Sequence, residues 1–299
     1  MITDFTFSDL VFEIRKREFS DYKVISTEIK RDIIKSLTLA KSGHSGGSLG
    51  IADLLTVLYF GSFLKHDPTN PLWNNRDRFI LSAGHLAPVL YSVLARAGYF
   101  PPSELSTLRK FGSRLQGHPA LDTALPGLES STGSLGQGVS IAVGMAISDK
   151  LIDKNERRVY CLSGDGELQE GASWEAAMSA GSLGLDNLCW IVDNNDCQID
   201  GRVKDVMSVY PLKEKFVAFK FDVIEIDGHD YQQIEICEKF TACNIDTSGS
   251  RWGWSYSRYH VSGHKRYYCR TTCYLPREND KSISGFLPSY AGNHQTYST

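Results

Sequence analysis

An acidic residue and an amide residue follow two apolar segments of the chain, and their spacing suits a divalent metal site. Asp165 follows the apolar run 158–163, and Asn195 follows the run 188–192. If both runs are parallel strands joined by one helix, the two turns lie side by side at the carboxyl edge of the sheet. Carboxylate and amide oxygens of low total charge suit Mg²⁺ or Ca²⁺ better than Zn²⁺.

This metal site lacks a ligand, and the sequence predicts what the ligand is. A single carboxylate holds Mg²⁺ weakly, and Mg²⁺ usually takes further oxygens from substrate phosphates. The glycines on either side of Asp165 allow backbone N–H groups to approach an anion closely. We therefore expect a diphosphate. The alternative is that Gly-Asp-Gly is an ordinary turn, but the placement of Asn195 and the segment 167–175 between them argue against it.

Three histidines share one local pattern, in which each follows a glycine in a segment without helical or strand periodicity. They are His44, His85 and His118. Imidazole is suited to proton transfer near neutral pH, and neutral donors can stabilise an alkoxide. Each histidine alone could be an ordinary loop or capping residue. The alternative is that all three share a catalytic role in proton transfer.

The elements that must position these residues follow from hydrophobic periodicity. A helix is predicted from Asp21, where Ile25, Ile29, Ile33 and Leu37 recur every four residues and Leu39 closes the stripe. The glycine-rich segment 42–50 is not expected inside a helix, and 98–132 is expected to be a long functional loop or a broken helix. Further helices are predicted at 51–63, 86–97, 134–151 and 170–183, and strands at 78–82, 158–163, 188–192 and 221–226.

Strands that alternate with helices predict βαβ units. The expected fold class is therefore α/β, a mostly parallel sheet with helices on both faces. We divide the chain into an N-terminal extension (1–20), one ligand-binding domain (21–245) and an aberrant tail (246–299). The tail is rich in tyrosine and has no regular period, so we interpret it as either out of the native reading frame or disordered.

Composition excludes several classes of protein. The net charge is −3, with 41% hydrophobic and 22% charged residues, so no strongly basic surface for nucleic acid or anionic membrane is expected. We find no apolar run of about 18 residues and no secretory signal. Seven cysteines, an odd number, favour free thiols and a cytoplasmic location. Cys161, Cys189 and Cys197 are expected to be buried thiols.

Several motifs together resemble the thiamine diphosphate-binding motif and neighbouring segments of transketolases, continuously from about residue 25 to about residue 235. The motif itself is Gly164-Asp165-Gly166 followed by Asp193-Asn194-Asn195. The segments that agree with it are Ser42-Gly43-His44, 78–85, 116–119, 131–138, 167–171 and 198–201.

The resemblance implies thiamine diphosphate as cofactor, with Mg²⁺ or Ca²⁺, and a role for each matching residue. Asp165, Asn195 and the carbonyl of Cys197 match the metal ligands. The remaining matches are backbone contacts to the cofactor at Gly166 and Gly133, a contact to the thiazolium ring at Leu135, active-site histidines at His44, His85 and His118, and at Glu170 a buried acid at the subunit interface that belongs to a proton network.

It also implies ketol transfer between sugar phosphates in the pentose phosphate pathway. Transketolases take a catalytic glutamate from a pyrimidine-binding domain, and this chain contains no match to that domain. We therefore expect the amino-terminal subunit of a split transketolase, working with a C-terminal subunit in a dimer of heterodimers. The alternatives are a subunit of deoxyxylulose-phosphate synthase or of a 2-oxo-acid dehydrogenase, or a catalytically silent binding or regulatory subunit.

Overall fold

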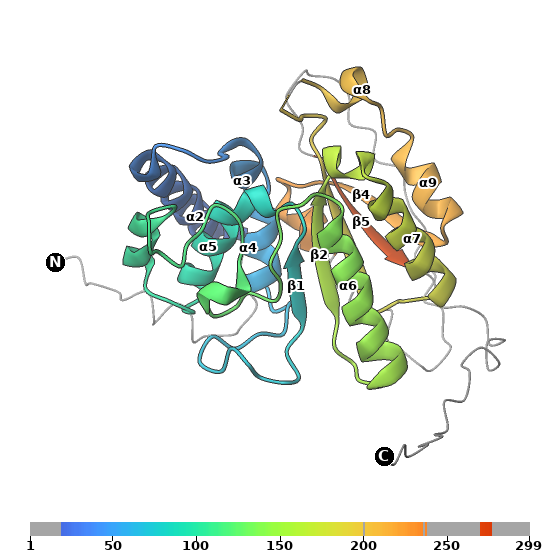
Figure 1. Ribbon diagram of the computed structural model, residues 1–299, viewed down its shortest axis with the longest axis horizontal. Coiled ribbons are helices and arrows are strands. Elements are labelled where there is room, and N and C mark those ends of the chain that lie inside the picture. Colours follow the sequence, from blue (N-terminus) through green and yellow to red (C-terminus); the bar gives the residue numbers. More distant parts are fainter. Residues whose placement is uncertain (1–18, 200, 236, 238–269, 277–299) are drawn as a thin grey trace, which may run out of the picture.

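The strands form one sheet, shown in the computed structural model in Figure 1. The structure describes residues 19–199, 201–235, 237 and 270–276. The strand order is β1-β2-β3-β5-β4, with β1 parallel to β2 and β2 parallel to β3. The strands are β1 (Arg78–Leu81), β2 (Val159–Gly164), β3 (Leu188–Asn194), β4 (Phe221–Asp227) and β5 (Arg270–Pro276).

Strand β5 was not predicted, because we expected no regular structure in the tail. It runs antiparallel to both β3 and β4 and lies between them. Consequently β4 runs in the same direction as β1, β2 and β3, and the sheet is mostly parallel, as expected. The rest of the predicted tail, and the predicted N-terminal extension up to residue 18, lie outside the described residues.

Helices cover both faces of the sheet (Figure 1). One face packs against α2 (Phe19–Ala40), α4 (Ala52–Phe60) and α5 (Ala87–Arg96), and the other against α6 (Gln137–Ile147), α7 (Gly171–Leu183) and α9 (Leu212–Ala218). The shorter elements are α3 (Gly46–Gly50), α8 (Val203–Val206), the 3-10 turns η1 (Gly84–Leu86), η2 (Pro102–Thr107), η3 (Leu121–Thr123) and η5 (Gly166–Gln169), and the π-turn η4 (Ser148–Ile152).

The strands read as continuous apolar runs because both of their faces are buried. In β2, Tyr160 and Leu162 belong to the core beneath α2, α4 and α5, whereas Val159 and Cys161 belong to the core beneath α6 and α7. This alternation follows from the two-residue period of a strand. The rigid sheet fixes where each strand ends, and hence where each strand-end loop begins.

Two helix predictions were wrong in detail. Residues 46–50 form helix α3, although the segment 42–50 was expected to be non-helical. The absence of a side chain allows this turn to approach η1, since a Cβ at Gly47 would lie 2.6 Å from a methyl carbon of Leu86.

The second wrong prediction placed Leu39 in the apolar stripe of α2. Leu39 is 56% exposed, because it lies two residues beyond Leu37 and therefore on another side of the helix.

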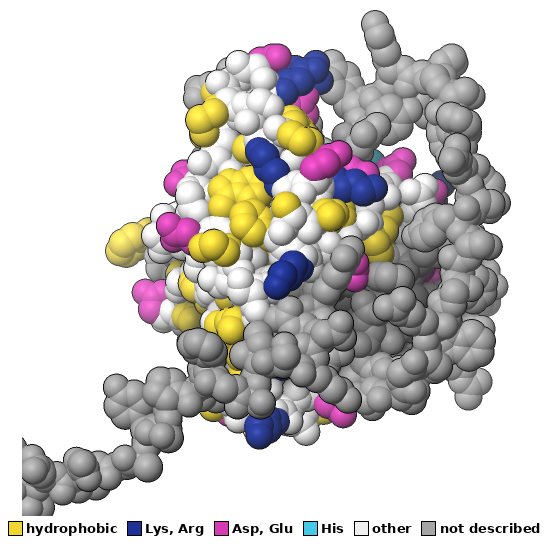
Figure 2. All heavy atoms as spheres, turned by 90° about the vertical axis from the view of Figure 1, so that its right-hand side faces the viewer, with side chains coloured by type: hydrophobic (Ala, Val, Ile, Leu, Met, Phe, Trp, Pro, Cys, Tyr) yellow, Lys and Arg dark blue, Asp and Glu magenta, His cyan; other side chains and the backbone are white. Residues whose placement is uncertain are grey.

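The side of the molecule that carries α8 and α9 has acidic, basic and apolar side chains interspersed (Figure 2). Within the part of the chain that the structure describes, no helix has both the length and the apolar character needed to cross a bilayer.

A buried carboxylate joins the end of β4 to the helices on one face of the sheet. Asp53 of α4 accepts hydrogen bonds from His229 Nδ1 (2.7 Å), Tyr231 (2.9 Å) and Lys30 (2.7 Å). Burial acts to raise the pKa of Asp53, but its hydrogen bonds with His229, Lys30 and Ser26 hold it well below its usual value. The hydrogen bond to Asp53 in turn raises the pKa of His229.

Candidate functional site

Two strand-end loops meet through the side chain of Asp165. Asp165 follows β2, and Gly164 pairs with Asp193 of β3. The N–H of Asp196 donates a 2.7 Å hydrogen bond to Asp165 Oδ2, and the N–H of Gly166 donates a 2.9 Å bond to Oδ1. The carboxylate therefore reaches across to the residue next to Asn195, as the βαβ arrangement predicts.

The side chain of Asn195 is fixed by its own loop. Its Nδ2 group donates to Asp193 Oδ2 (2.8 Å), and its Oδ1 atom accepts the N–H of Cys197 (2.9 Å). The thiol of Cys197 is exposed, so our expectation of a buried thiol was wrong there, whereas Cys161 and Cys189 are buried. The turn after β3 places Cys197 outside the sheet, and only the Cys197 carbonyl was expected at the metal.

Burial dominates the electrostatics of Asp165, which is 1% exposed. Burial, together with the nearby charges of Asp193 and Asp196, raises the pKa of Asp165 to about 7, against the effect of its two backbone hydrogen bonds. A divalent cation would offset this concentration of negative charge. No three His, Cys, Asp or Glu side chains are grouped as a metal site among the residues described. Besides the Asp165 carboxylate, a cation here would therefore depend on amide, carbonyl and diphosphate oxygens, which fits Mg²⁺ with thiamine diphosphate.

The structure brings the three predicted histidines together. The rings of His44 and His85 meet edge to face, with centroids 5.3 Å apart. Burial, with the charges of His44 and His118, lowers the pKa of His85 to about 4. Burial, with the charges of His44 and Arg109, also lowers the pKa of His118. His85 is therefore neutral at physiological pH and can donate a hydrogen bond without carrying charge.

The loop before α6 lies against the histidine loops. A Cβ at Gly133 would lie 3.1 Å from the ring of His118, and a Cβ at Gly84 would lie 2.7 Å from the nitrogen of Gly133. Gly133 also has φ = 150°, which favours glycine. The hydroxyl of Thr132 is buried with no hydrogen-bond partner among the described residues. This cradle, with a free buried hydroxyl, fits a bound cofactor.

Sequence reasoning did not single out Arg109. Its backbone has φ = 59°, uncommon for a residue other than glycine. Its guanidinium lies against Gly43 and Gly117, since Cβ atoms there would be 3.4 Å and 3.3 Å from it. These glycines precede His44 and His118, so Arg109 adds positive charge between two histidine loops.

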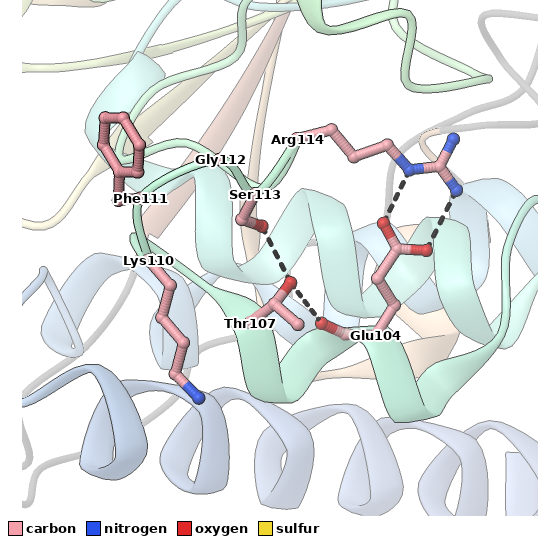
Figure 3. A pocket seen from close by; sticks show the side chains of 7 residues that line it. All are labelled: Glu104, Thr107, Lys110, Phe111, Gly112, Ser113 and Arg114. Carbon is pink, nitrogen blue, oxygen red and sulfur yellow. Dashed lines mark hydrogen bonds and ion pairs between the residues drawn. The ribbon is translucent and has the colours of Figure 1, made fainter.

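The loop that carries Arg109 is closed by its own hydrogen bonds (Figure 3). Arg114 forms a two-bond ion pair with Glu104, at 2.6 and 2.9 Å, and Thr107 bonds Ser113 at 2.7 Å. The N–H of Arg109 donates to the carbonyl of Leu115 (2.8 Å). The loop is therefore a defined structure that leads into His118.

Two further predicted residues lie at the surface of the single chain. Leu135 is 38% exposed, and Glu170, which immediately precedes α7, is also exposed. A Cβ at Gly136 would lie 2.7 Å from the Cβ of Glu170, so both belong to one region at the start of α6.

The fold and the matching family model define the class of this protein, an α/β thiamine diphosphate-binding domain. The family described as "Transketolase, thiamine diphosphate binding domain" matches residues 23–243. The chain belongs to the transketolase family, in which it corresponds to the amino-terminal domain.

Relatives and solved structures agree with this assignment. The chain is 43% identical over 215 residues to the 6-deoxy-6-sulfo-D-fructose transketolase subunit SqwG of Clostridium sp. (strain MSTE9), covering 70% of this chain and 77% of that one. It is 40% identical over 209 residues to an apulose-4-phosphate transketolase subunit of Phocaeicola vulgatus (70% and 73%). Campylobacter jejuni transketolase has a TM-score of 0.71 at 37% identity, covering 76% of this chain and 36% of that one. The chain thus spans about a third of a full-length transketolase.

His85 and His229 provide a pH test of the site within one molecule. We expect the His85 ring to remain neutral from pH 8 down to about 5, because its pKa lies near 4. His229 should become protonated above pH 6.5, because its hydrogen bond to Asp53 raises its pKa. Ring chemical shifts measured by NMR against pH check both residues. A His85 midpoint at or above that of His229 contradicts the geometry described here.

Proposed function

We propose that this chain is the amino-terminal subunit of a split transketolase and binds Mg²⁺ and thiamine diphosphate. The observation that carries this proposal is the hydrogen bond from the Asp196 N–H to the Asp165 carboxylate. It holds the loops of Asp165 and Asn195 together at the carboxyl edge of a parallel sheet, where such sheets bind ligands. The transketolase subunits among the relatives support the same conclusion.

Each residue of the proposed site has a physical role. Asp165, Asn195 and the Cys197 carbonyl would hold Mg²⁺, and Gly166 and Gly133 would present backbone groups to the cofactor. Leu135 would contact its thiazolium ring. When bound, thiamine diphosphate supplies the nucleophilic carbon and the electron sink for cleaving the carbon–carbon bond of a ketose.

The histidines would donate hydrogen bonds to the sugar substrate and transfer protons to and from its hydroxyl groups. Because His85 is neutral, it can donate a hydrogen bond to an oxygen that becomes negative during the reaction. The His44 ring meets the His85 ring, and the charge of His118 acts on His85. His44 and His118 are exposed, so they can exchange protons with substrate hydroxyls and water. Together these donors suit transfer of a two-carbon ketol group from a ketose phosphate to an aldose phosphate.

We further propose a partner. The chain matches about a third of full-length transketolases, whereas it covers about three quarters of relatives that are named as subunits. A C-terminal, pyrimidine-binding subunit would supply the remaining catalytic groups and the sugar phosphate contacts. We propose that the assembly is a cytoplasmic dimer of heterodimers in which Glu170 connects paired sites, and that it serves the pentose phosphate pathway.

Substitution of the metal carboxylate tests the site. Asp165→Ala should abolish binding of thiamine diphosphate in the presence of Mg²⁺, because the diphosphate then faces no cation. Isothermal titration calorimetry measures the affinity. The exposed Glu156, at the other end of β2, provides a control: Glu156→Ala should bind like the wild type. Unchanged affinity in Asp165→Ala would remove the site assignment.

Reconstitution tests the partner. Ketol transfer from a ketose phosphate should appear only when the chain is mixed with a candidate C-terminal subunit, and should require Mg²⁺ and thiamine diphosphate. Each of the two proteins on its own is the control. Complex formation without activity would favour a silent binding subunit, and activity of this chain alone would contradict the split arrangement.

A further inference from the structure

We infer that Glu167 is a positioning residue of the proposed cofactor site, and that its carboxylate holds together the three loops that carry Asp165, His85 and Leu135. The inference rests on the proposed function, because the three loops act jointly only if they bind one cofactor. Glu167 lies in the turn η5 and is 2% exposed.

The carboxylate of Glu167 accepts three hydrogen bonds from three segments of the chain. The Ser82 hydroxyl and the N–H of Gly136 (2.8 Å) both donate to Oε1. The N–H of Gly164 donates to Oε2 (3.3 Å). Ser82 and Gly136 are distant from Glu167 in sequence, so these bonds fix tertiary structure rather than a local turn.

Each donor lies close in sequence to a residue of the proposed site. Ser82 follows β1 and leads into the turn that contains His85. Gly136 caps the amino terminus of α6 with φ = 81°, directly after Leu135. Gly164 is the last residue of β2, directly before Asp165. One carboxylate therefore sets the relative positions of three loops.

The partners of Glu167 suit a carboxylate acceptor. All three are donors, and an ionised carboxylate is an acceptor at every lone pair. Hydrogen bonds to a charged acceptor are stronger than neutral ones, and α6 directs its positive end toward the carboxylate.

Tight packing leaves little room for the loops to shift. A Cβ at Gly138 would lie 2.5 Å from the Cα of Ser82, so the start of α6 lies directly against the end of β1. In Glu167→Gln, an amide N–H₂ group replaces one of the two carboxylate oxygens. This amide group would face the backbone N–H of Gly136 or Gly164, and an N–H group cannot accept a hydrogen bond. A buried donor is then left unpaired, and the loops must move apart.

The test measures cofactor affinity and stability separately on the full chain. With saturating Mg²⁺, Glu167→Gln should raise the dissociation constant of thiamine diphosphate by about 10- to 100-fold. This is the usual effect of removing a residue that orients the binding residues without contacting the ligand itself. Ser82→Ala removes one donor and should weaken binding less. Glu156→Gln, the same change at an exposed position, should leave the affinity unchanged. Calorimetric titration gives the affinities, and thermal unfolding without cofactor gives the stabilities.

The outcomes separate this inference from the proposed function. Failure of the wild type to bind thiamine diphosphate, both alone and mixed with the C-terminal subunit, overturns the proposed function. If the wild type binds and Glu167→Gln binds equally well, only the positioning role is overturned, even if the variant melts at a lower temperature. If Glu167→Gln does not fold, Ser82→Ala decides: weaker binding by a folded variant supports the inference, and wild-type affinity overturns it.

Discussion

The proposed site depends on one buried carboxylate. Asp165 is 1% exposed at the end of β2, and the N–H of Asp196 from the next strand's loop donates to it. A buried charge is costly unless it is paired, so the backbone donors stabilise this carboxylate and the proposed cation would stabilise it further. Parallel neighbouring strands end at the same edge of the sheet. The loop of Asn195 therefore lies beside the loop of Asp165.

Close approach between loops completes the site. A Cβ at Gly84 or Gly136 would collide with a neighbouring loop, and one at Gly133 would lie 3.1 Å from the His118 ring, so these segments pack closely against their neighbours. The carboxylate of Glu167 binds donors from the same segments. The result is a site built from strand ends and helix starts, whose geometry is set by the rigid sheet below.

The sequence predicted the elements whose signal is local. Strands β1 to β4 were recognised as apolar runs, and Asp165, Asn195 and the histidines as polar residues after them. Strand β5 could not be predicted, because its place between β3 and β4 is set by long-range pairing. Arg109 and Glu167 were missed as site residues for the same reason: the contacts that give them a role come from segments distant in sequence. The roles of the predicted site residues remain predictions.

A crystal structure of the chain with Mg²⁺ and thiamine diphosphate tests the central claim most directly. We predict one Mg²⁺ ion with oxygens of Asp165, Asn195 and the diphosphate at about 2.0–2.1 Å, the usual Mg²⁺ distance. The Cys197 carbonyl should complete the protein ligands. An ion bound elsewhere, or Asp165 and Asn195 oxygens too far apart to share one ion, would contradict the account.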